Sequence, residues 1–437
     1  MPEPKNRVLI ITYYWPPAGG PGVQRFLKFS KHLRSFDWEP IIITPENGAY
    51  PYEDPSLMAD VGEDLKIIKT KTLEPFEIYN KLQGKKGKSV PVAMGGIKDS
   101  KSIFQKLAKY IRANFFLPDA RVGWNRYAYK AAAKVIMQNK IDAIITTGPP
   151  HSTHLVGRAL KRKFNIPWLA DFRDPWTKIY YNKFLPRSKK TQAKDLALET
   201  SVLGSADIIT TVSQGMAKDL KDRARDIAVI LNGFENEDIP DTSPKKTDQF
   251  TIGYIGNFKP NQNLPSLWEA FKELSSESSE FANKAKLKFT GSIDAFILKD
   301  LKKVGLEKQL ILQDFVPHHE ATRIMSETCL LLLPIPEAKN NQYILTGKIF
   351  EYLANKNAIL SIGPTDGNAA QILSECKRDK MCHYQDKAQI KAQIKHYFEL
   401  WMKDQMVYKH RNDAHMIYSR KALTEQLAAE LNKIKHD

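Results

Sequence analysis

The sequence contains very little cysteine. Its 437 residues include three cysteines, Cys329, Cys376 and Cys382. An odd number, without the short spacing of zinc-binding motifs, argues against a disulfide framework and against a structural zinc site. A reducing compartment is the simplest setting for such a chain. We therefore predict a cytoplasmic protein without structural disulfides.

Long apolar runs are also missing. The run at residues 8–12, close to the N-terminus, is too short for the apolar part of a signal peptide. A membrane-spanning helix requires roughly 18 apolar residues, and no stretch of the sequence approaches that length. We expect a soluble protein, or one that lies peripherally on the inner face of the plasma membrane.

Acidic residues are outnumbered by basic ones. There are 66 Lys and Arg against 49 Asp and Glu, which gives a net charge of +17. Such a surface attracts nucleic acid, anionic lipid headgroups, or nucleotide and diphosphate substrates. The sequence has no nucleic-acid-binding motif and no platform of aromatic and basic residues, so we expect no nucleic-acid partner. Its length and ordinary apolar content indicate two or three globular domains.

Short apolar runs alternate with amphipathic segments in two series, which are separated by a polar, proline-containing stretch at residues 235–249. This alternation predicts an α/β protein with two doubly wound, Rossmann-like domains. We expect an N-terminal domain over residues 1–240, a C-terminal domain over 241–410, and a terminal helix within 411–437 that packs back on the N-terminal domain. The expected strands are 8–12, 40–44, 141–147, 168–171, 208–212 and 229–231, then 251–255, 287–290, 310–313, 329–334 and 358–362.

Residues 75–125 interrupt the first series. A basic loop, GKKGK, occupies residues 84–88, and residues 102–116 have helical periodicity. This helix combines an apolar face with cations. It could bind the surface of an anionic membrane, or its apolar face could pack on the core of the N-terminal domain. The apolar residues are Ile103, Phe104, Leu107, Ile111 and Phe115, and the cations are Lys101, Lys106, Lys109 and Arg112.

Three segments of the first series follow strand ends and carry candidate ligand-binding residues. The first is the loop PPAGGPGVQR, whose glycines let a phosphate or sugar approach a helix N-terminus. The others are GPPHSTH and DFRDPW. The alternatives are a glycine turn needed for packing, a histidine packed locally, and an ion pair that braces a loop. The candidates are Gly19, Gly20, Gly22, Arg25, His151, His154, Asp171, Arg173 and Asp174.

The second series repeats this arrangement of strand, glycine loop and helix. The segment GYIGNFKPNQN contributes Asn257 and Lys259. The most specific segment is LTGKIFEYLANKNAILSIGPTDGNAAQIL. In it, Lys348 could bind a diphosphate, and Glu351 could accept hydrogen bonds from both ribose hydroxyls. The alternative for these two side chains is an exposed ion pair of little energetic value. A further loop over a helix N-terminus adds the donor-site candidates Gly363 and Asn368.

Several of these segments together resemble a subgroup of the family 4 glycosyltransferases found in bacterial surface-polysaccharide clusters. The segments are PPAGGPGVQR, GPPHSTH with DFRDPW, GYIGNF and GKIFEYLANKNAIL. The resemblance extends from Arg7 to about Leu373. It implies a GT-B fold, in which two Rossmann-like domains face each other across a cleft, and sugar transfer with retention of configuration. The implied partners are a nucleotide-sugar donor, held mainly by the C-terminal domain, and a glycan or lipid-linked acceptor. No cofactor and no metal is expected, because helix N-termini and basic side chains carry the diphosphate charge.

The sequence departs from the family pattern at three positions. Asn257 and Asn263 stand where the family often has Arg and Lys, and Tyr343 stands where the first Glu of a two-glutamate motif is usual. We therefore expect Lys259 and Lys348 to bind the diphosphate. For the chemical step, the resemblance and the position of the histidines indicate that His151, or failing that His154, contacts the reacting sugar.

Two other functions remain compatible with the sequence. One is another GT-B enzyme, such as a sugar-nucleotide epimerase that hydrolyses its own donor. The other is a non-catalytic basic protein that binds membranes or nucleic acid.

Overall fold

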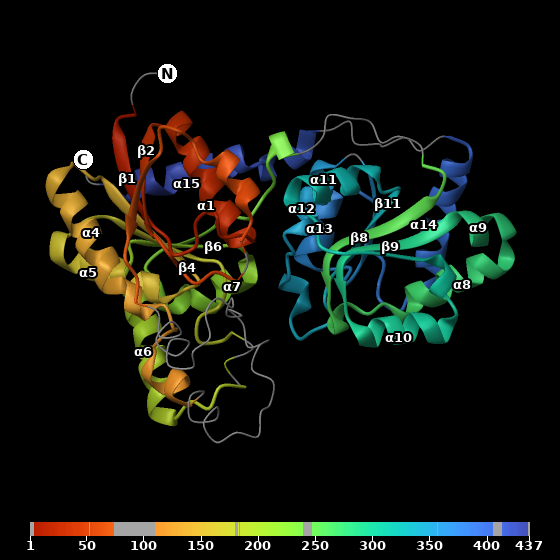
Figure 1. The fold of residues 1–437 in the computed structure, drawn as a ribbon, viewed down its shortest axis with the longest axis horizontal. Helices are drawn as coiled ribbons and strands as arrows, with labels where there is room; N and C mark the ends of the chain where they lie inside the picture. Colours follow the sequence, from red (N-terminus) through yellow and green to blue (C-terminus); the bar gives the residue numbers. More distant parts are fainter. Residues whose placement is uncertain are drawn as a thin grey trace. The chain divides into compact units, whose positions relative to one another are not determined.

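The chain divides into two compact units (Figure 1). The N-terminal unit comprises Met1–Leu231 together with Lys421–Asp437, and the C-terminal unit comprises Asn232–Arg420. The structure is a computed structural model, and it describes residues 4–51, 53–73, 110–179, 182, 184–238, 247–355, 357–404 and 413–435.

The N-terminal unit is built on a parallel sheet in the order β3-β2-β1-β4-β5-β6-β7. The inner strands are continuous aliphatic runs, as expected where helices cover both faces of a parallel sheet. In β1, for example, Val8 to Ile11 have no solvent exposure. The strands are β1 (Asn6–Ile11), β2 (Trp38–Pro45), β3 (Lys66–Thr70), β4 (Ala143–Gly148), β5 (Trp168–Phe172), β6 (Ile208–Thr211) and β7 (Ile227–Val229).

Helices from both ends of the chain cover this sheet. The last helix, α15, belongs to the N-terminal unit because Leu423, Leu427 and Leu431 pack in the same apolar cluster as β1 and β2. In addition, the indole N–H of Trp38 donates a hydrogen bond of 3.1 Å to Asn432. The main helices are α1 (Pro21–His32), α4 (Asn125–Gln138), α5 (Ser152–Phe164), α6 (Lys189–Ser205), α7 (Gln214–Leu220) and α15 (Arg420–Ile434).

The C-terminal unit has its own parallel sheet, in the order β10-β9-β8-β11-β12. The prediction of an α/β protein with two Rossmann-like sheets is therefore confirmed. The strands are β8 (Phe250–Phe258), β9 (Ala285–Ile293), β10 (Leu310–Gln313), β11 (Leu330–Pro334) and β12 (Ala358–Ile362). The helices are α8 (Pro265–Glu277), α9 (Ser279–Lys284), α10 (Ala295–Val304), α11 (His318–Glu327), α12 (Lys348–Ala354), α13 (Asn368–Glu375) and α14 (Lys387–Met402).

The structure differs from the sequence prediction in several elements. The loop expected from residue 256 begins later, because β8 stays paired with β9 as far as Phe258, opposite Ile293. Strand β3 and helices α4, α7, α9, α10 and α11 were not predicted. Residues 84–88 and 102–109 of the basic segment lie outside the described residues, whereas residues 110–115 are helical.

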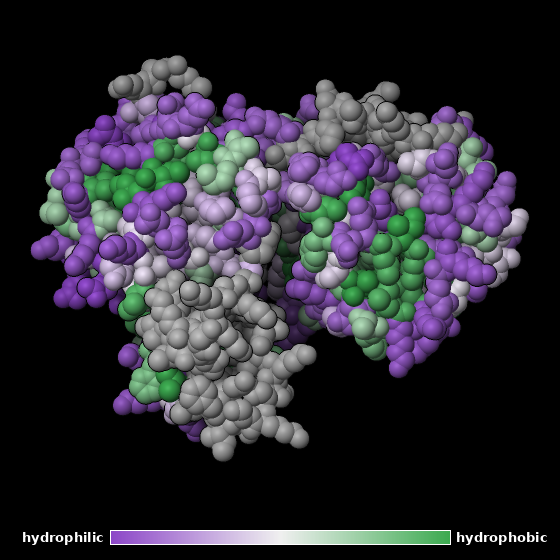
Figure 2. Space-filling view, in the orientation of Figure 1, coloured by the Kyte–Doolittle hydropathy of each residue, from purple (hydrophilic) through white to green (hydrophobic). Residues whose placement is uncertain are grey.

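The described surface is largely hydrophilic in the view of Figure 2, with separate hydrophobic areas on each unit. Among the helices that the structure describes, none is long and apolar enough to cross a membrane.

Candidate active site

In each unit the order of the strands reverses at one point. In the N-terminal unit, β2 pairs with one side of β1 and β4 with the other. In the C-terminal unit, β8 lies in the same way between β9 and β11. Ligands of doubly wound sheets bind outside the carboxyl ends of the strands at such switch points. The segments that follow β1, β4, β8 and β11 are therefore the candidate binding segments.

His154 lies in the first turn of α5 and is fully buried. Its Nδ1 is 2.9 Å from the Thr146 hydroxyl, and its ring stacks on Phe172 with centroids 4.4 Å apart. Burial, followed by the nearby Arg173 guanidinium, lowers the pKa of His154 to about 3. This imidazole is thus neutral at physiological pH and forms part of the core.

His151 directly precedes α5 and keeps a small exposed fraction of 7%. Its ring lies parallel to that of Trp176, with an interplanar angle of 8° and centroids 5.3 Å apart. Burial lowers the pKa of His151 well below its usual value, and His154 and Arg173 lower it further. Apart from a weak contact with the backbone of Pro175, its ring nitrogens have no hydrogen-bond partner in the described part of the chain. The small exposed fraction distinguishes His151 from the fully buried His154, although the ring nitrogens of both residues are shielded from solvent.

Gly148, at the end of β4, allows this arrangement. A Cβ atom at this position would lie 2.6 Å from His154 Nε2 and 2.9 Å from His151 Nδ1. Both imidazoles therefore lie directly against the backbone at the carboxyl end of the strand. A larger residue would displace one or both rings.

The Arg173 guanidinium lies against the first turn of α1. A Cβ atom at Gly22 would be 1.5 Å from Arg173 Nη1, and Arg173 Nη2 donates a hydrogen bond of 2.6 Å to the carbonyl of Pro149. Helix α1 has no side-chain cap and no acidic residue in its first turn. Burial lowers the pKa of Arg173, an effect that Asp171 and then Asp174 oppose. A cation beside the positive end of a helix favours an anionic ligand.

Arg25 and Asp171 lie in the core and form an ion pair with each other, whereas ligand-binding residues were expected at the surface of the site. Both are fully buried, and Arg25 Nη2 is 2.9 Å from Asp171 Oδ1. The Thr147 and Thr210 hydroxyls donate the remaining hydrogen bonds to this carboxylate. The pair thus joins α1 to three adjacent strands, which is the loop-bracing alternative considered above. Asp174 is exposed beside Arg173, and Gly19 and Gly20 lie in the loop that leads to α1.

Asp119, which sequence reasoning missed, anchors the first turn of α5. Its carboxylate accepts hydrogen bonds of 2.8 Å from both the amide and the hydroxyl of Ser152. A carboxylate at this end of a helix satisfies otherwise unpaired amides. Burial raises the pKa of Asp119, and the bonds from Ser152 counteract this effect. No local motif indicates the contact, because the two residues are 33 positions apart.

In the C-terminal unit, Lys348 begins α12 and extends over the end of β8. A Cβ atom at Gly256 would lie 2.6 Å from Lys348 Nζ, and Gly256 has a φ of 122°, which disfavours any other residue. The ammonium is also 5.2 Å from the centre of the Tyr254 ring. Burial lowers the pKa of Lys348, and the Glu351 carboxylate opposes this effect. A largely buried cation thus lies at the switch point between β8 and β11.

Glu351 follows one turn later on α12. Apart from its attraction to the Lys348 ammonium, its carboxylate has no hydrogen bond or ion pair within the described ranges. Lys259 is exposed just beyond β8, and the exposed Asn257 accepts a hydrogen bond of 2.7 Å from Ser292. Lys348 and Glu351 therefore offer a cation and a carboxylate on one side of a short helix, with Lys259 further along the loop.

The remaining predicted donor residues have mixed roles. The amide of Gly363 donates a backbone hydrogen bond to Cys382, which is a structural contact. The side-chain nitrogen of Asn368, at the start of α13, is buried without a partner among the described residues. Asn263 is occupied, because its Oδ1 accepts from the Trp268 indole and its Nδ2 donates to Asp300. The side-chain nitrogen of Asn368 could thus still bind a ligand, whereas the side chain of Asn263 is already hydrogen-bonded at both ends.

The described ranges contain no group of three or more His, Cys, Asp or Glu side chains arranged to hold a metal ion.

Comparison with known protein families finds a match over part of the chain. Residues 89–238 match the family model described as Glycosyltransferase Family 4. No curated protein matches the chain at a significant level by sequence.

Several solved structures share the fold over nearly the whole chain. Sucrose-phosphate synthase from Thermosynechococcus elongatus is 12% identical with a TM-score of 0.60, and 98% of this chain and 99% of that chain are covered. The trehalose-6-phosphate synthase OtsA is 13% identical with a TM-score of 0.59, at 98% and 99% coverage. A TarM variant from S. aureus, solved with Fondaparinux, alpha-GlcNAc-glycerol and UDP, is 11% identical with a TM-score of 0.56, at 98% and 100% coverage.

The fold that this chain shares with these enzymes is GT-B, the predicted class. The match to the family 4 model covers residues 89–238, about a third of the chain, and agrees with this fold.

Proposed function

We propose that this protein transfers a sugar from a nucleoside diphosphate to a glycan or lipid-linked acceptor in the synthesis of a cell-surface polysaccharide. The observation that carries the proposal is the Lys348 ammonium, which is held over Gly256 at the end of β8 and has the Glu351 carboxylate one turn away. Lys348 binds the diphosphate, and Glu351 accepts hydrogen bonds from the ribose hydroxyls. Lys259 and the buried amide nitrogen of Asn368 supply further polar contacts to the donor.

The electrostatics at Lys348 support this role in the chemical step. Sugar transfer leaves a nucleoside diphosphate whose negative charge increases as the glycosidic bond to the donor breaks. A cation in a largely desolvated position interacts more strongly with that charge than an exposed cation would. Burial lowers the pKa of Lys348, and a bound diphosphate would oppose this effect because it favours the charged form.

His151 contacts the sugar that is transferred. With its pKa lowered by burial, the imidazole acts as a neutral hydrogen-bonding group and not as a cation. Both ring nitrogens remain available to hydroxyl groups of the sugar. His154 supports His151 from within the core, where it stacks on Phe172.

The start of α1 binds an anionic group of the donor or the acceptor. Arg173 and the amides around Gly20 and Gly22 supply the positive potential. Arg25 and Asp171 hold α1 and β5 in register from within the core, and therefore act on this segment without touching the ligand.

A donor-release assay distinguishes the proposed activity from its alternatives. A panel of nucleotide sugars is incubated with the full chain, with and without a prenol-diphosphate-linked sugar, and release of nucleoside diphosphate is measured. We expect release that increases at least about tenfold when acceptor is added, with a glycosylated product. Equal release of free sugar in both conditions would favour a hydrolysing epimerase, and no release with any donor would favour a non-catalytic binding protein.

A membrane surface near residues 110–115 is a further part of the proposal. The exposed fractions of Tyr110, Ile111 and Phe115 are 46%, 42% and 75%, so these side chains do not form part of the core. Exposed aromatic and aliphatic side chains beside basic residues suit an anionic bilayer interface. Binding there would bring the enzyme to a lipid-linked acceptor.

Phe115→Glu is expected to reduce co-sedimentation with phosphatidylglycerol-containing vesicles at low salt by roughly tenfold or more, because a buried phenyl group is worth about 1.5–3 kcal/mol. The matched control is Phe315→Glu, which changes a side chain that is 66% exposed in the C-terminal unit. This control should bind as the wild type does. Wild-type protein that does not sediment with these vesicles would end the membrane proposal.

A further inference from the structure

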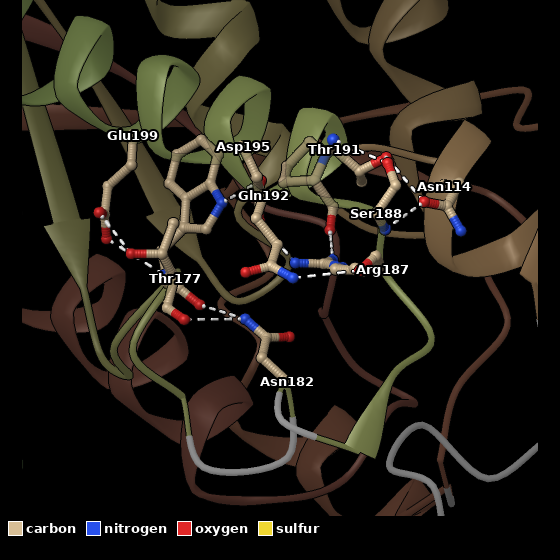
Figure 3. Close-up of polar contacts among 11 residues, drawn as sticks. Asn114, Thr177, Asn182, Arg187, Ser188, Thr191, Gln192, Asp195 and Glu199 are labelled. Carbon is tan, nitrogen blue, oxygen red and sulfur yellow. Dashed lines mark hydrogen bonds and ion pairs between the residues drawn. The ribbon is translucent and has the colours of Figure 1, made fainter.

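Helix α6 carries three buried polar residues where a helix in this position would usually present apolar ones. Thr191, Asp195 and Glu199 are four residues apart, so they lie on one face of the helix, and their exposed fractions are 7%, 1% and 1%. We call these three residues the α6 polar stripe. Figure 3 shows that the stripe faces the segments that carry Thr177, Arg187 and Asn114.

The members of the α6 polar stripe hold other segments of the N-terminal unit by their side chains. Thr191 donates a hydrogen bond of 2.7 Å to the side-chain oxygen of Asn114. Glu199 accepts a hydrogen bond of 2.7 Å from the Thr177 hydroxyl and is 2.6 Å from Arg223. Glu199 thus holds the residue that follows Trp176, but neither of these two residues of the stripe contacts the Trp176 indole or a histidine through a hydrogen bond.

Asp195 is connected to the candidate active site. Its Oδ1 accepts a hydrogen bond of 2.8 Å from the Trp176 indole, and its Oδ2 is 2.6 Å from the Arg187 guanidinium. Trp176 is itself 3% exposed and stacks on His151. The contacts therefore run from Arg187 to Asp195, from Asp195 to Trp176, and from Trp176 to His151.

The stacking contact matters because the imidazole is oriented by packing and not by firm hydrogen bonds. No described residue makes a firm hydrogen bond to the ring nitrogens of His151. The His151 ring lies in a cluster of rings, nearly parallel to that of Trp176 and tilted against those of Phe172 and His154. The hydrogen bond to Asp195 fixes the Trp176 indole within this cluster. Loss of that bond would let the indole shift, and the imidazole packed against it would shift as well.

Burying Asp195 has an energetic cost that a stabilising role alone does not explain. Burial raises the pKa of this carboxyl, while Trp176 and Arg187 counteract the effect. Replacing a buried ion pair with well-packed apolar residues is often neutral or stabilising. A buried carboxylate that instead holds a tryptophan against a reactive histidine fits the expectation that departures from an apolar core occur at functional sites.

We propose that Asp195, acting through Trp176, is a positioning residue for His151. The inference rests on the proposed contact between His151 and the transferred sugar. Asp195 itself touches neither donor nor acceptor. Its effect should thus appear in the chemical step and not in donor binding.

The test compares Asp195→Ala, Asp195→Asn and Glu199→Gln in the full chain. Asp195→Ala should lower kcat about 10- to 100-fold, the range for a displaced active-site group, with the KM for donor within about twofold of wild type. Asp195→Asn should recover most of this loss, because the amide oxygen still accepts the indole hydrogen bond. Glu199→Gln, on the same face of α6 but without a bond to Trp176, should keep wild-type kcat.

A double-mutant cycle separates positioning from a merely structural role. In a His151→Ala background, Asp195→Ala should have no further effect on kcat. Additive effects, or equal losses for the Asp195 and Glu199 variants, would overturn the inference. If Asp195→Ala does not fold, Trp176→Phe takes its place, because it keeps an aromatic ring and removes the N–H group that Asp195 holds. If His151→Ala has wild-type kcat, the proposed role of His151 fails; if only the Asp195 and Trp176 variants have wild-type kcat, the positioning inference alone fails.

Discussion

Replacing Lys348 with alanine is expected to weaken the binding of a nucleoside diphosphate about 10- to 150-fold. This range corresponds to roughly 1.5–3 kcal/mol for a charge-assisted contact. The upper part of the range is favoured because Lys348 is largely buried over Gly256, where water screens its charge poorly. Isothermal titration calorimetry with UDP and GDP measures the effect directly.

The matched control for this experiment is Lys395→Ala. Lys395 lies on α14 with a side chain that is 63% exposed, so its removal changes the net charge equally but leaves the segment after β8 intact. We expect wild-type nucleotide affinity for this variant. Equal nucleotide affinity in the Lys348 variant and the control would show that the donor site is wrongly assigned.

Replacing His151 with alanine is expected to lower kcat about 100- to 1,000-fold while the KM for donor changes little. This is the range for removing a group that stabilises a transition state. Steady-state transfer assays with saturating acceptor report both constants. His154→Ala should act differently: it removes a buried ring from between Phe172 and Thr146, and should mainly reduce the free energy of unfolding. Wild-type turnover in both variants would show that neither histidine takes part in the reaction.

The pH dependence of kcat provides a second test of His151. Burial lowers the pKa of this residue well below the usual 6.5, so the neutral form persists as the pH falls through that value. The activity that depends on neutral His151 is therefore kept down to pH 6, and the acid limb that an ordinary histidine would produce is absent. A wild-type kcat that falls tenfold for each pH unit below 6.5, and that loses this limb in His151→Gln, would contradict the account.

The sequence predicted the central strands well because their signals are local. The aliphatic runs of β1, β4 and β11 are buried on both faces, and glycine-containing loops follow several of them. Strand β3 was missed because its sequence, KIIKT, is short and includes two lysines, as is common at the edge of a sheet. The position of Lys348 and Glu351 on one helix could be predicted because both lie within one motif.

Contacts between segments that are distant in the sequence could not be predicted from local sequence patterns. Arg25 and Asp171 are 146 positions apart, and only the fold shows that they neutralise each other within the core. The link between Asp195 and Trp176 has a partial signal, since polar residues recur every fourth position along α6. That spacing alone is equally typical of a solvated helix face, and burial is what changes its meaning.

A crystal structure of the full chain with a bound nucleoside diphosphate tests the donor site most directly. Crystals soaked separately with UDP and GDP should show, for at least one nucleotide, diphosphate oxygens within hydrogen-bonding distance of Lys348 Nζ and beside Gly256. The ribose hydroxyls should lie at the Glu351 carboxylate. A nucleotide bound elsewhere, with Lys348 and Glu351 free of contact, or failure of both nucleotides to bind, would contradict the proposed donor site.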